Sequence, residues 1–382
     1  MTTTFSLDDL YPFHRKWIEA NRSVKKLALR MARQGSSPDS IGAYVYDVAK
    51  FAEQLGGTPD EVLTQSRDWA SEINSYLDDM IAKRGASPQT GQRRYSAIKR
   101  WLTVNEVEAK WEKVEVPRKE ARESGQVPKK EELRLILGAA GLVDKVLVLV
   151  AVSSALRVGS ITKLQLKYLD LSREVPPVKV PKEITKNRKS FVTFVSPEAK
   201  QAIEAYLRER EHRGELLCPD SYLVTTERPR GKRLLARSVQ DRWENMLRRV
   251  NLYRKASPDR RWHVFHFHLL RKYYKTWATL SGMNSDVVEY TMGHRSGIKN
   301  LYFIPDEAEN VPPEVLDKLE EEYRKAIPAL TVTSDEDKLR EQEARITEQA
   351  MNLKAKEGLI DQLTKRLDAI EAEVKARKVP IS

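Results

Sequence analysis

The sequence predicts a mainly α-helical protein with one small β-sheet, an α+β fold in three parts. Three observations support this prediction. Most of the 382 residues place apolar side chains at helical spacing. One short stretch, 176–196, alternates in polarity and is rich in β-branched residues, which is typical of strands. Residues 333–382 repeat an apolar side chain every seven positions, as a coiled-coil helix does.

The first part is expected to span residues 1–120 as a bundle of helices. Helical spacing begins in residues 1–34, which form an N-terminal helical extension. The Ser and Asp of SSPDS (36–40) are typical N-caps for the next helix, which ends at a Gly pair. Further helices are predicted over about 66–84 and after SPQT (87–90). The following stretch, 114–133, is charged, contains two prolines and is interpreted as a linker.

The second part is expected to span residues 126–332. Its segment 133–166 is richly apolar and mostly helical, and should form the core. The alternating stretch has a basic centre, TKNRK, and predicts a hairpin or a three-stranded sheet with a basic turn. Two more helices are predicted at PEAKQAIEAYLRERE and SVQDRWENMLRRVNLY.

The third part, 333–382, is expected to be a coiled-coil oligomerisation helix. The seven-residue repeat consists of Leu339, Ile346, Leu353, Ile360, Leu367, Val374 and Ile381. The second seam is apolar at Leu363 and Ile370, whereas Gln342, Gln349 and Lys356 occupy it earlier. Pairing with another chain is therefore expected to be firm only from about Ile360 onward. The alternative is a single helix that folds back on its own domain.

The charge is concentrated in the second part. The whole chain carries a net charge of +12, and residues 126–332 hold 37 Lys and Arg against 26 Asp and Glu. Such an excess of positive charge indicates a polyanionic partner, and double-stranded DNA is the expected one. A basic but merely solvated surface is the plain alternative.

Several classes of protein are not expected from this sequence. A single cysteine, Cys218, excludes an internal disulfide, and no Cys/His cluster has zinc spacing, so no metal site is expected. The N-terminus lacks a signal pattern, and no uncharged apolar run approaches about 18 residues. We therefore expect a soluble cytoplasmic protein, associated with the nucleoid and not with a membrane.

Four clusters in the basic second part fit phosphoryl transfer. They are SSALRVGSITKLQL (153–166), ITKNRKSF (184–191), HFHLLRKYYKTWA (266–278) and MGHRSGIKNLYF (292–303). The reaction needs cations on the non-bridging oxygens, a nucleophile in line and a proton for the leaving oxygen. Arginine matches phosphate geometry, lysine or histidine can supply a proton, and tyrosine can be a covalent nucleophile.

These clusters together resemble the tyrosine recombinase/integrase family, which includes the phage integrases and Xer-type recombinases. The resemblance covers roughly residues 36–310. The family's first arginine matches Arg157 in ALRVGSI, and its hairpin lysine matches TKNRK. Its His-x-x-Arg box matches His268 and Arg271. Its Leu/Met-Gly-His box matches Met292-Gly293-His294, with Tyr302 shortly after.

The resemblance implies a role for each matched residue. Arg157 and Arg271 would hold the scissile phosphate, and His268 would be a general base or a hydrogen-bond partner. His294, at a helix start, would bind a phosphate oxygen while Tyr302 attacks the phosphorus. Lys186 would protonate the 5′ leaving oxygen, with Lys189 as the alternative.

The implied function is site-specific DNA recombination through a covalent 3′-phosphotyrosine, without metal or other cofactor. The resemblance further implies integration, excision or transposition of a mobile element by a homo-oligomer, with four protomers on two DNA sites. Delivery of Tyr302 within its own protomer or to a neighbour stays open. A type IB topoisomerase and a catalytically inactive DNA-binding protein of this fold are the alternatives.

The N-terminal helices resemble the family's SAM-like, core-DNA-binding domain. One of them interleaves basic and aromatic residues, and its candidates for DNA contact are Arg93, Arg94, Lys99 and Arg100. Lys189 of the second part is a further candidate for DNA contact. A solvated helix with a buried aromatic stripe is the alternative. The chain departs from the family pattern at Ser160, at Lys272 and in a His294-to-Tyr302 interval one residue shorter than in many members.

Overall fold

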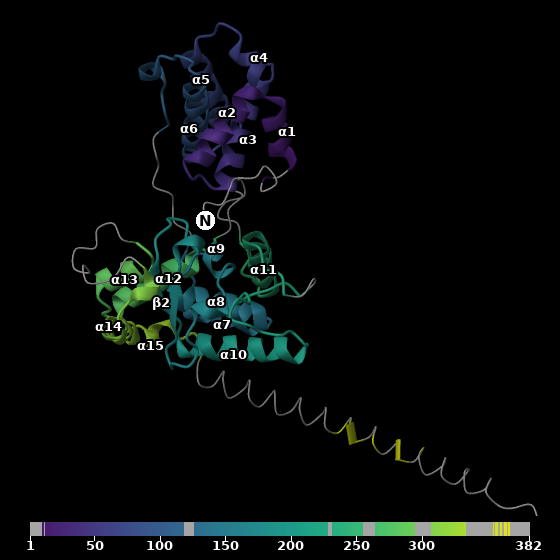
Figure 1. Cartoon of the computed structure of the whole chain (residues 1–382), viewed down its shortest axis with the longest axis vertical. Coiled ribbons are helices and arrows are strands. Elements are labelled where there is room, and N and C mark those ends of the chain that lie inside the picture. Colours follow the sequence, from purple (N-terminus) through teal and green to yellow (C-terminus); the bar gives the residue numbers. More distant parts are fainter. Residues whose placement is uncertain are drawn as a thin grey trace, which may run out of the picture. The chain divides into compact units, whose positions relative to one another are not determined.

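The computed structural model describes residues 10, 12–117, 126–227, 231–254, 264–294 and 307–333, with scattered helical positions between Lys354 and Arg366. The chain divides into two compact units, Met1–Glu123 and Ser124–Ser382, and each is described by itself (Figure 1). The described residues are mainly helical with one small sheet, so the predicted fold class is confirmed.

The first unit is entirely helical in its described residues. Its helices are α1 (Pro12–Ala20), α2 (Arg22–Arg33), α3 (Pro38–Gln54), α4 (Pro59–Leu63), α5 (Trp69–Asp78) and α6 (Pro88–Val104), with short turns at Asp79–Lys83 and Trp111–Lys113. Both predicted helix starts are confirmed, and each has a serine cap: Ser37 accepts the backbone N–H of Ser40, and Ser87 accepts that of Thr90.

The predicted N-terminal helix is interrupted at Asn21. This residue adopts an extended backbone with φ −130° and ψ 115°, so α1 and α2 are separate helices. Its side-chain amide donates to the carbonyl of Trp17 at 3.0 Å, which satisfies the end of α1. Helical spacing continues across this break, so periodicity alone does not reveal it.

The second unit contains the hairpin and the remaining helices (Figure 1). The helices are α7 (Lys130–Gly138), α8 (Leu142–Ser154), α9 (Val158–Ile161), α10 (Pro197–His212), α11 (Ala236–Arg249), α12 (Leu269–Leu280), α13 (Ser285–Thr291), α14 (Pro313–Arg324) and α15 (Ile327–Leu330). The strands are β1 (Pro177–Val180) and β2 (Phe191–Phe194), and short turns lie at Leu166–Tyr168, Lys182–Ile184 and Ala308–Asn310.

Helix α8 forms the centre of this core. It is apolar on nearly all sides and contacts α7, α9, α10, α11, α12, α15 and β2. A helix that is hydrophobic all round is typical of such a buried position. Its segment was predicted to be the core from composition, and almost all its residues are buried.

The hairpin is a two-stranded antiparallel sheet in the described residues. Pro177 pairs with Phe194 and Val180 with Phe191. Leu169 makes an isolated bridge to Val178, but it forms no third strand. The hairpin version of the prediction therefore holds, and the exposed turn between the strands carries the predicted lysines.

The segment before the C-terminal repeat is fixed to the second unit. The hydroxyl of Tyr323 donates to the carbonyl of Ser153 at 2.8 Å. The Glu198 carboxylate accepts the backbone N–H groups of Val332 and Thr333, each at 2.8 Å. Most of the heptad repeat lies outside the described residues, but Ile360 and Leu363 are helical and exposed. In the described part of the chain, no helix has the length and apolar character to cross a membrane.

Candidate active site

Arg157 lies at a corner between α8 and α9. Ala155 ends α8 in the left-handed conformation with φ 54°, which is unfavourable for a residue with a Cβ. This turn reverses the chain, so that Arg157 is the N-cap residue of α9. Burial lowers the pKa of Arg157. The strained Ala155 was not anticipated from the sequence, because only glycine signals this conformation reliably.

Arg271 is buried in the first turn of α12 and points at the ends of two other helices. Its guanidinium donates to the carbonyl of Ala155, and to that of Met292 at 2.5 Å. A third contact joins its Nη2 to Nε2 of His294 at 3.0 Å. Burial, followed by the charge of Arg157, lowers the pKa of Arg271 to about 10. The guanidinium thus remains a cation at neutral pH.

The two arginines lack a direct acidic partner in the described part of the chain. Neither Arg157 nor Arg271 forms an ion pair with a carboxylate there, Arg157 makes no side-chain hydrogen bond, and Glu289 acts on Arg271 only through its charge. By contrast, Arg210, which is as buried as Arg271, forms a two-pronged pair with Glu215. The charge of Arg157 acts unfavourably on the buried Arg271, and a bound anion would relieve this repulsion. Cations without a direct acidic partner therefore mark a candidate anion site.

His294 is held by the C-terminal end of α13. The N–H of Gly293 donates to the carbonyl of Tyr290 at 2.8 Å, and the N–H of His294 to that of Glu289 at 2.9 Å. This pair of bonds is the Schellman motif, which commonly has glycine at its left-handed position. His294 therefore follows the end of one helix. The helix start predicted at this position falls on residues 295–306, outside the described ones.

Gly293 is required at this turn for two reasons. Its φ is +71°, and an added Cβ would lie 2.6 Å from Cε1 of Phe191 on β2. The close approach of α13 to β2 depends on this missing side chain. Gly293 therefore allows the turn that carries His294 to pack closely against β2.

Replacing Gly293 with alanine is expected to lower the free energy of unfolding by about 1–3 kcal/mol, because the new methyl group overlaps Phe191 in a strained backbone. Thermal unfolding measures this loss. Gly138→Ala is the matched control, since nothing lies within 4 Å of its added Cβ and its φ is not positive. Equal unfolding temperatures for the two variants would contradict this reason for the glycine.

His268 is the N-cap residue of α12 and is exposed to solvent. Partial burial of the ring, and then the charges of Arg271, His266 and Arg157, lower its pKa. The ring is therefore neutral at pH 7 and able to accept a proton. The electrostatic effect of both arginines on His268 also indicates that the three side chains share one region.

The basic turn of the hairpin carries the two candidate lysines. Both Lys186 and Lys189 are exposed. The N–H of Arg188 donates to the carbonyl of Thr185 at 3.4 Å, so Lys186 occupies the tip of this turn. The backbone of Lys189 is instead tied to the Thr185 hydroxyl at 3.1 Å.

Ser160 connects the hairpin to the arginine corner. Its buried hydroxyl donates to the carbonyl of Ile184 at 3.0 Å, just before the basic turn. A carboxylate at this position could not donate that bond. The serine that departs from the family pattern therefore has a structural role here.

The structure thus brings together Arg271 and His294 by direct contact, and Arg157, His268 and Arg271 electrostatically. No described contact joins Lys186 or Lys189 to them. Tyr302 lies outside the described residues. Sequence reasoning missed Glu289, whose carboxylate lies 2.6 Å from Nδ1 of His294. Its position five residues before the histidine is the signal that could have revealed it.

The four basic candidates of the first unit have partners within that unit. Arg93 and Arg94 pair with the buried Asp47 at 3.1 and 3.5 Å. Burial raises the pKa of Asp47 to about 6, although Arg93 and Arg94 oppose that rise. Lys99 lies over the rings of Tyr95 and Trp111, and Arg100 lies over that of Tyr44. Of the two arginines that pair with Asp47, Arg93 keeps the larger exposed fraction, 45% against 16% for Arg94.

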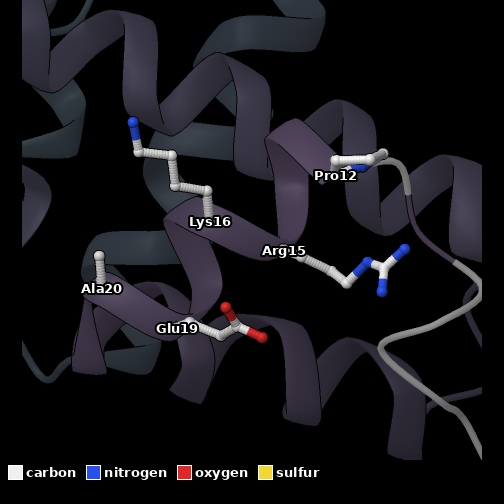
Figure 2. Close-up of a pocket in the computed structure, with 5 residues that line it drawn as sticks. All are labelled: Pro12, Arg15, Lys16, Glu19 and Ala20. Carbon is white, nitrogen blue, oxygen red and sulfur yellow. The ribbon is translucent and has the colours of Figure 1, made fainter.

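A pocket elsewhere in the first unit offers no comparable site. It is lined by Pro12, Arg15, Lys16, Glu19 and Ala20 of α1 (Figure 2). Lys16 points away from Arg15 and Glu19, so the charged groups do not converge (Figure 2). In the ranges that the structure covers, no group of three or more His, Cys, Asp or Glu residues could hold a metal ion.

Comparison with known proteins identifies relatives of this chain. Residues 126–300 match the phage integrase family. Tyrosine recombinase XerC of Shewanella sp. (strain ANA-3) is 26% identical over 243 residues, which cover 61% of this chain and 76% of that protein. Tyrosine recombinase XerC of Shewanella oneidensis is 27% identical over 244 residues, which cover 61% and 74%.

Solved structures share the fold at lower identity. A lambda integrase dimer bound to a COC′ core site matches with a TM-score of 0.53 and 13% identity, over 72% of this chain and 94% of that one. The Tn1549 transposon integrase in complex with transposon right end DNA matches with a TM-score of 0.51 and 17% identity, over 78% and 98%. Residues 126–300 of this chain thus match the phage integrase family, and its curated relatives are tyrosine recombinases.

Proposed function

We propose that this protein is a site-specific DNA recombinase, which cuts and rejoins duplex DNA through a covalent 3′-phosphotyrosine. The observation that carries the proposal is the pair Arg157 and Arg271, which converge without a carboxylate partner next to His294. A phosphodiester supplies the missing negative charge. The similar proteins named above also support the proposal. Two are tyrosine recombinases, and two are integrases whose structures were solved bound to DNA.

In the proposed reaction, the arginines bind the non-bridging oxygens of the scissile phosphate. Negative charge grows on these oxygens in the transition state, so fixed cations stabilise it more than the ground state. Arg271 is held by the Ala155 and Met292 carbonyls, so it needs little reorganisation when DNA binds. These two contacts and the one to His294 use at most three of its five N–H donors.

In the cleavage step, one proton leaves the nucleophile and another reaches the leaving oxygen. Tyr302 attacks and forms the tyrosine–phosphate bond while the bond to the 5′ oxygen breaks. The neutral ring of His268 accepts the proton of the Tyr302 hydroxyl, and Lys186 gives one to the 5′ oxygen. The energy of the broken bond is kept in the phosphotyrosine, so rejoining follows by the reverse steps.

The proposal extends to the first unit and to the assembly. The helical first unit contacts the DNA duplex as the core-DNA-binding domain, with Arg93 the most exposed of the pair at Asp47. The second unit, 126–332, is the catalytic domain, and the helix of 333–382 joins protomers. Four protomers on two sites then form the synapse, which exchanges strands of a mobile element with its target. The exposed Ile360 and Leu363 support an unfilled apolar seam on that helix.

A nicked suicide substrate tests the proposal against its two rivals. The nick releases the strand that would otherwise reseal, so a covalent intermediate accumulates. We expect protein–DNA adducts and, with intact paired sites, strand exchange. Adducts with relaxation of supercoils but no exchange would indicate a type IB topoisomerase. Binding without adducts would indicate an inactive DNA-binding protein and contradict the proposal.

A further inference from the structure

A half-buried carboxylate, that of Glu289, contacts the predicted phosphate-binding histidine. Glu289 is the third residue from the end of α13, and His294 is the second residue beyond its cap. The Schellman motif places these two positions one above the other, and in many helices an apolar pair fills them. Here the pair is polar: Oε2 of Glu289 lies 2.6 Å from Nδ1 of His294.

The contacts of His294 define which ring nitrogen carries the proton in the free protein. An arginine side chain has only N–H donors, so Nε2 of His294 must accept from Nη2 of Arg271 at 3.0 Å. The proton of the neutral ring is therefore on Nδ1, where it is donated to Glu289. For Nε2 to donate to a phosphate oxygen, the ring must gain a second proton.

Among the described residues, the charged side chains around His294 and its partner Glu289 come from two helices. Helix α12 contributes Arg271 and Lys275, and α13 contributes Glu289. Strand β2, which packs against α13, has the sequence FVTF and contributes no ionisable group. Lys275 Nζ lies 2.6 Å from Oε1 of Glu289. Partial burial raises the pKa of Glu289, but the hydrogen bonds from Lys275 and His294 outweigh it and leave the pKa below its ordinary value.

We propose that Glu289 is a positioning residue for DNA cleavage. Its carboxylate orients His294 and balances the positive charge that appears when Nε2 takes a proton from solvent and donates it to a non-bridging phosphate oxygen. The proton returns to solvent when the phosphate leaves. Lys275 also pairs with this carboxylate and so weakens the stabilisation that Glu289 gives to the positive charge on His294. The inference rests on the proposed recombinase function, because the phosphate is that of the scissile bond.

Two substitutions of Glu289 distinguish the effect of its negative charge from the effect of its hydrogen-bond acceptor. Glu289→Gln keeps an oxygen that can accept from Nδ1 but removes the charge, and Glu289→Ala removes both. Glu322→Gln is the matched control: this carboxylate accepts the N–H of Asn284 at the other end of α13 and pairs with Lys325, but contacts no site residue. The exposed side-chain fractions are also close, 30% for Glu289 and 27% for Glu322.

The first measurement does not depend on activity. Imidazole nitrogen resonances in the full-length protein, assigned with His294→Ala, report the tautomer directly. We expect the Nδ1–H form of His294 in the free protein. In Glu289→Ala the contact from Arg271 keeps the proton on Nδ1, but the Nδ1 resonance should shift because its acceptor is lost. A ring protonated on Nε2 alone in the free wild-type protein would overturn the inference, even if the chain proves to be a recombinase.

The second measurement is the single-turnover rate of adduct formation on the suicide substrate. Glu289→Gln should slow adduct formation about ten- to a hundredfold, because it removes the negative charge beside His294. Glu322→Gln should leave the rate unchanged.

A double-variant cycle then assigns the effect to His294. In a His294→Ala background, Glu289→Gln should cost little more, because the ring that it serves is gone. An equal cost in both backgrounds, or an unchanged rate in Glu289→Gln, would overturn the positioning role. If the wild-type protein forms no adduct at all, the recombinase proposal fails, and the tautomer measurement still decides the Glu289–His294 pairing.

Discussion

Replacing Tyr302 with phenylalanine is expected to abolish covalent adduct formation and leave DNA binding intact. The substitution removes only the hydroxyl oxygen that would bond to phosphorus. Suicide-substrate cleavage and a gel-shift assay measure the two properties in the same preparation. Adducts formed by the Phe variant would assign the nucleophile to another tyrosine.

The described tyrosines around the site are poor alternatives. Burial raises the pKa of Tyr273 to about 12, and it raises those of Tyr274 and Tyr323 further. All three are buried. Tyr290→Phe is the matched control, because the Tyr290 hydroxyl accepts the backbone N–H of Val192 and serves the fold. This control should still form adducts.

Replacing Arg271 with alanine is expected to slow adduct formation about a hundred- to a thousandfold, as the loss of one well-placed donor to a developing oxyanion does. The change also frees the carbonyls of Ala155 and Met292, so the corner that holds Arg157 should loosen. Single-turnover cleavage with saturating protein measures the chemical step apart from binding.

Arg210→Ala is the control for the loss of a buried arginine as such. Arg210 is 4% exposed and Arg271 is 5% exposed, and both donate to backbone carbonyls. Arg210 differs in having Glu215 as a counter-charge. Its removal should lower thermal stability without slowing cleavage by the folded fraction. Similar rate losses in both variants would show that Arg271 acts only through the fold.

Much of the fold could be predicted because its signals are local. The caps Ser37 and Ser87, the apolar run of α8 and the alternation of the hairpin each lie within a few neighbouring residues. The break between α1 and α2 at Asn21 was not predicted, because helical spacing continues on both sides of it. The predicted family, helical class and enzyme class are confirmed.

The residue types of the candidate site could be predicted from the sequence, but the hydrogen bonds and ion pairs between them could not. The His-x-x-Arg and Gly-His boxes are visible in the sequence, yet the bond from Arg271 to Ala155 spans 116 positions. Asp47, which engages Arg93 and Arg94, lies 46 positions before Arg93. Glu289 is near His294, but its relevance depends on a left-handed turn at Gly293 that brings the two side chains together.

The most direct test of the account is to map the covalent link itself. Wild-type protein is trapped on the nicked substrate, digested with protease and nuclease, and analysed by mass spectrometry for a tyrosine that carries a nucleotide. The account predicts a single modified peptide that contains Tyr302, joined to the 3′ phosphate of the cleaved strand. A link to a different residue, or to the 5′ end, would contradict it.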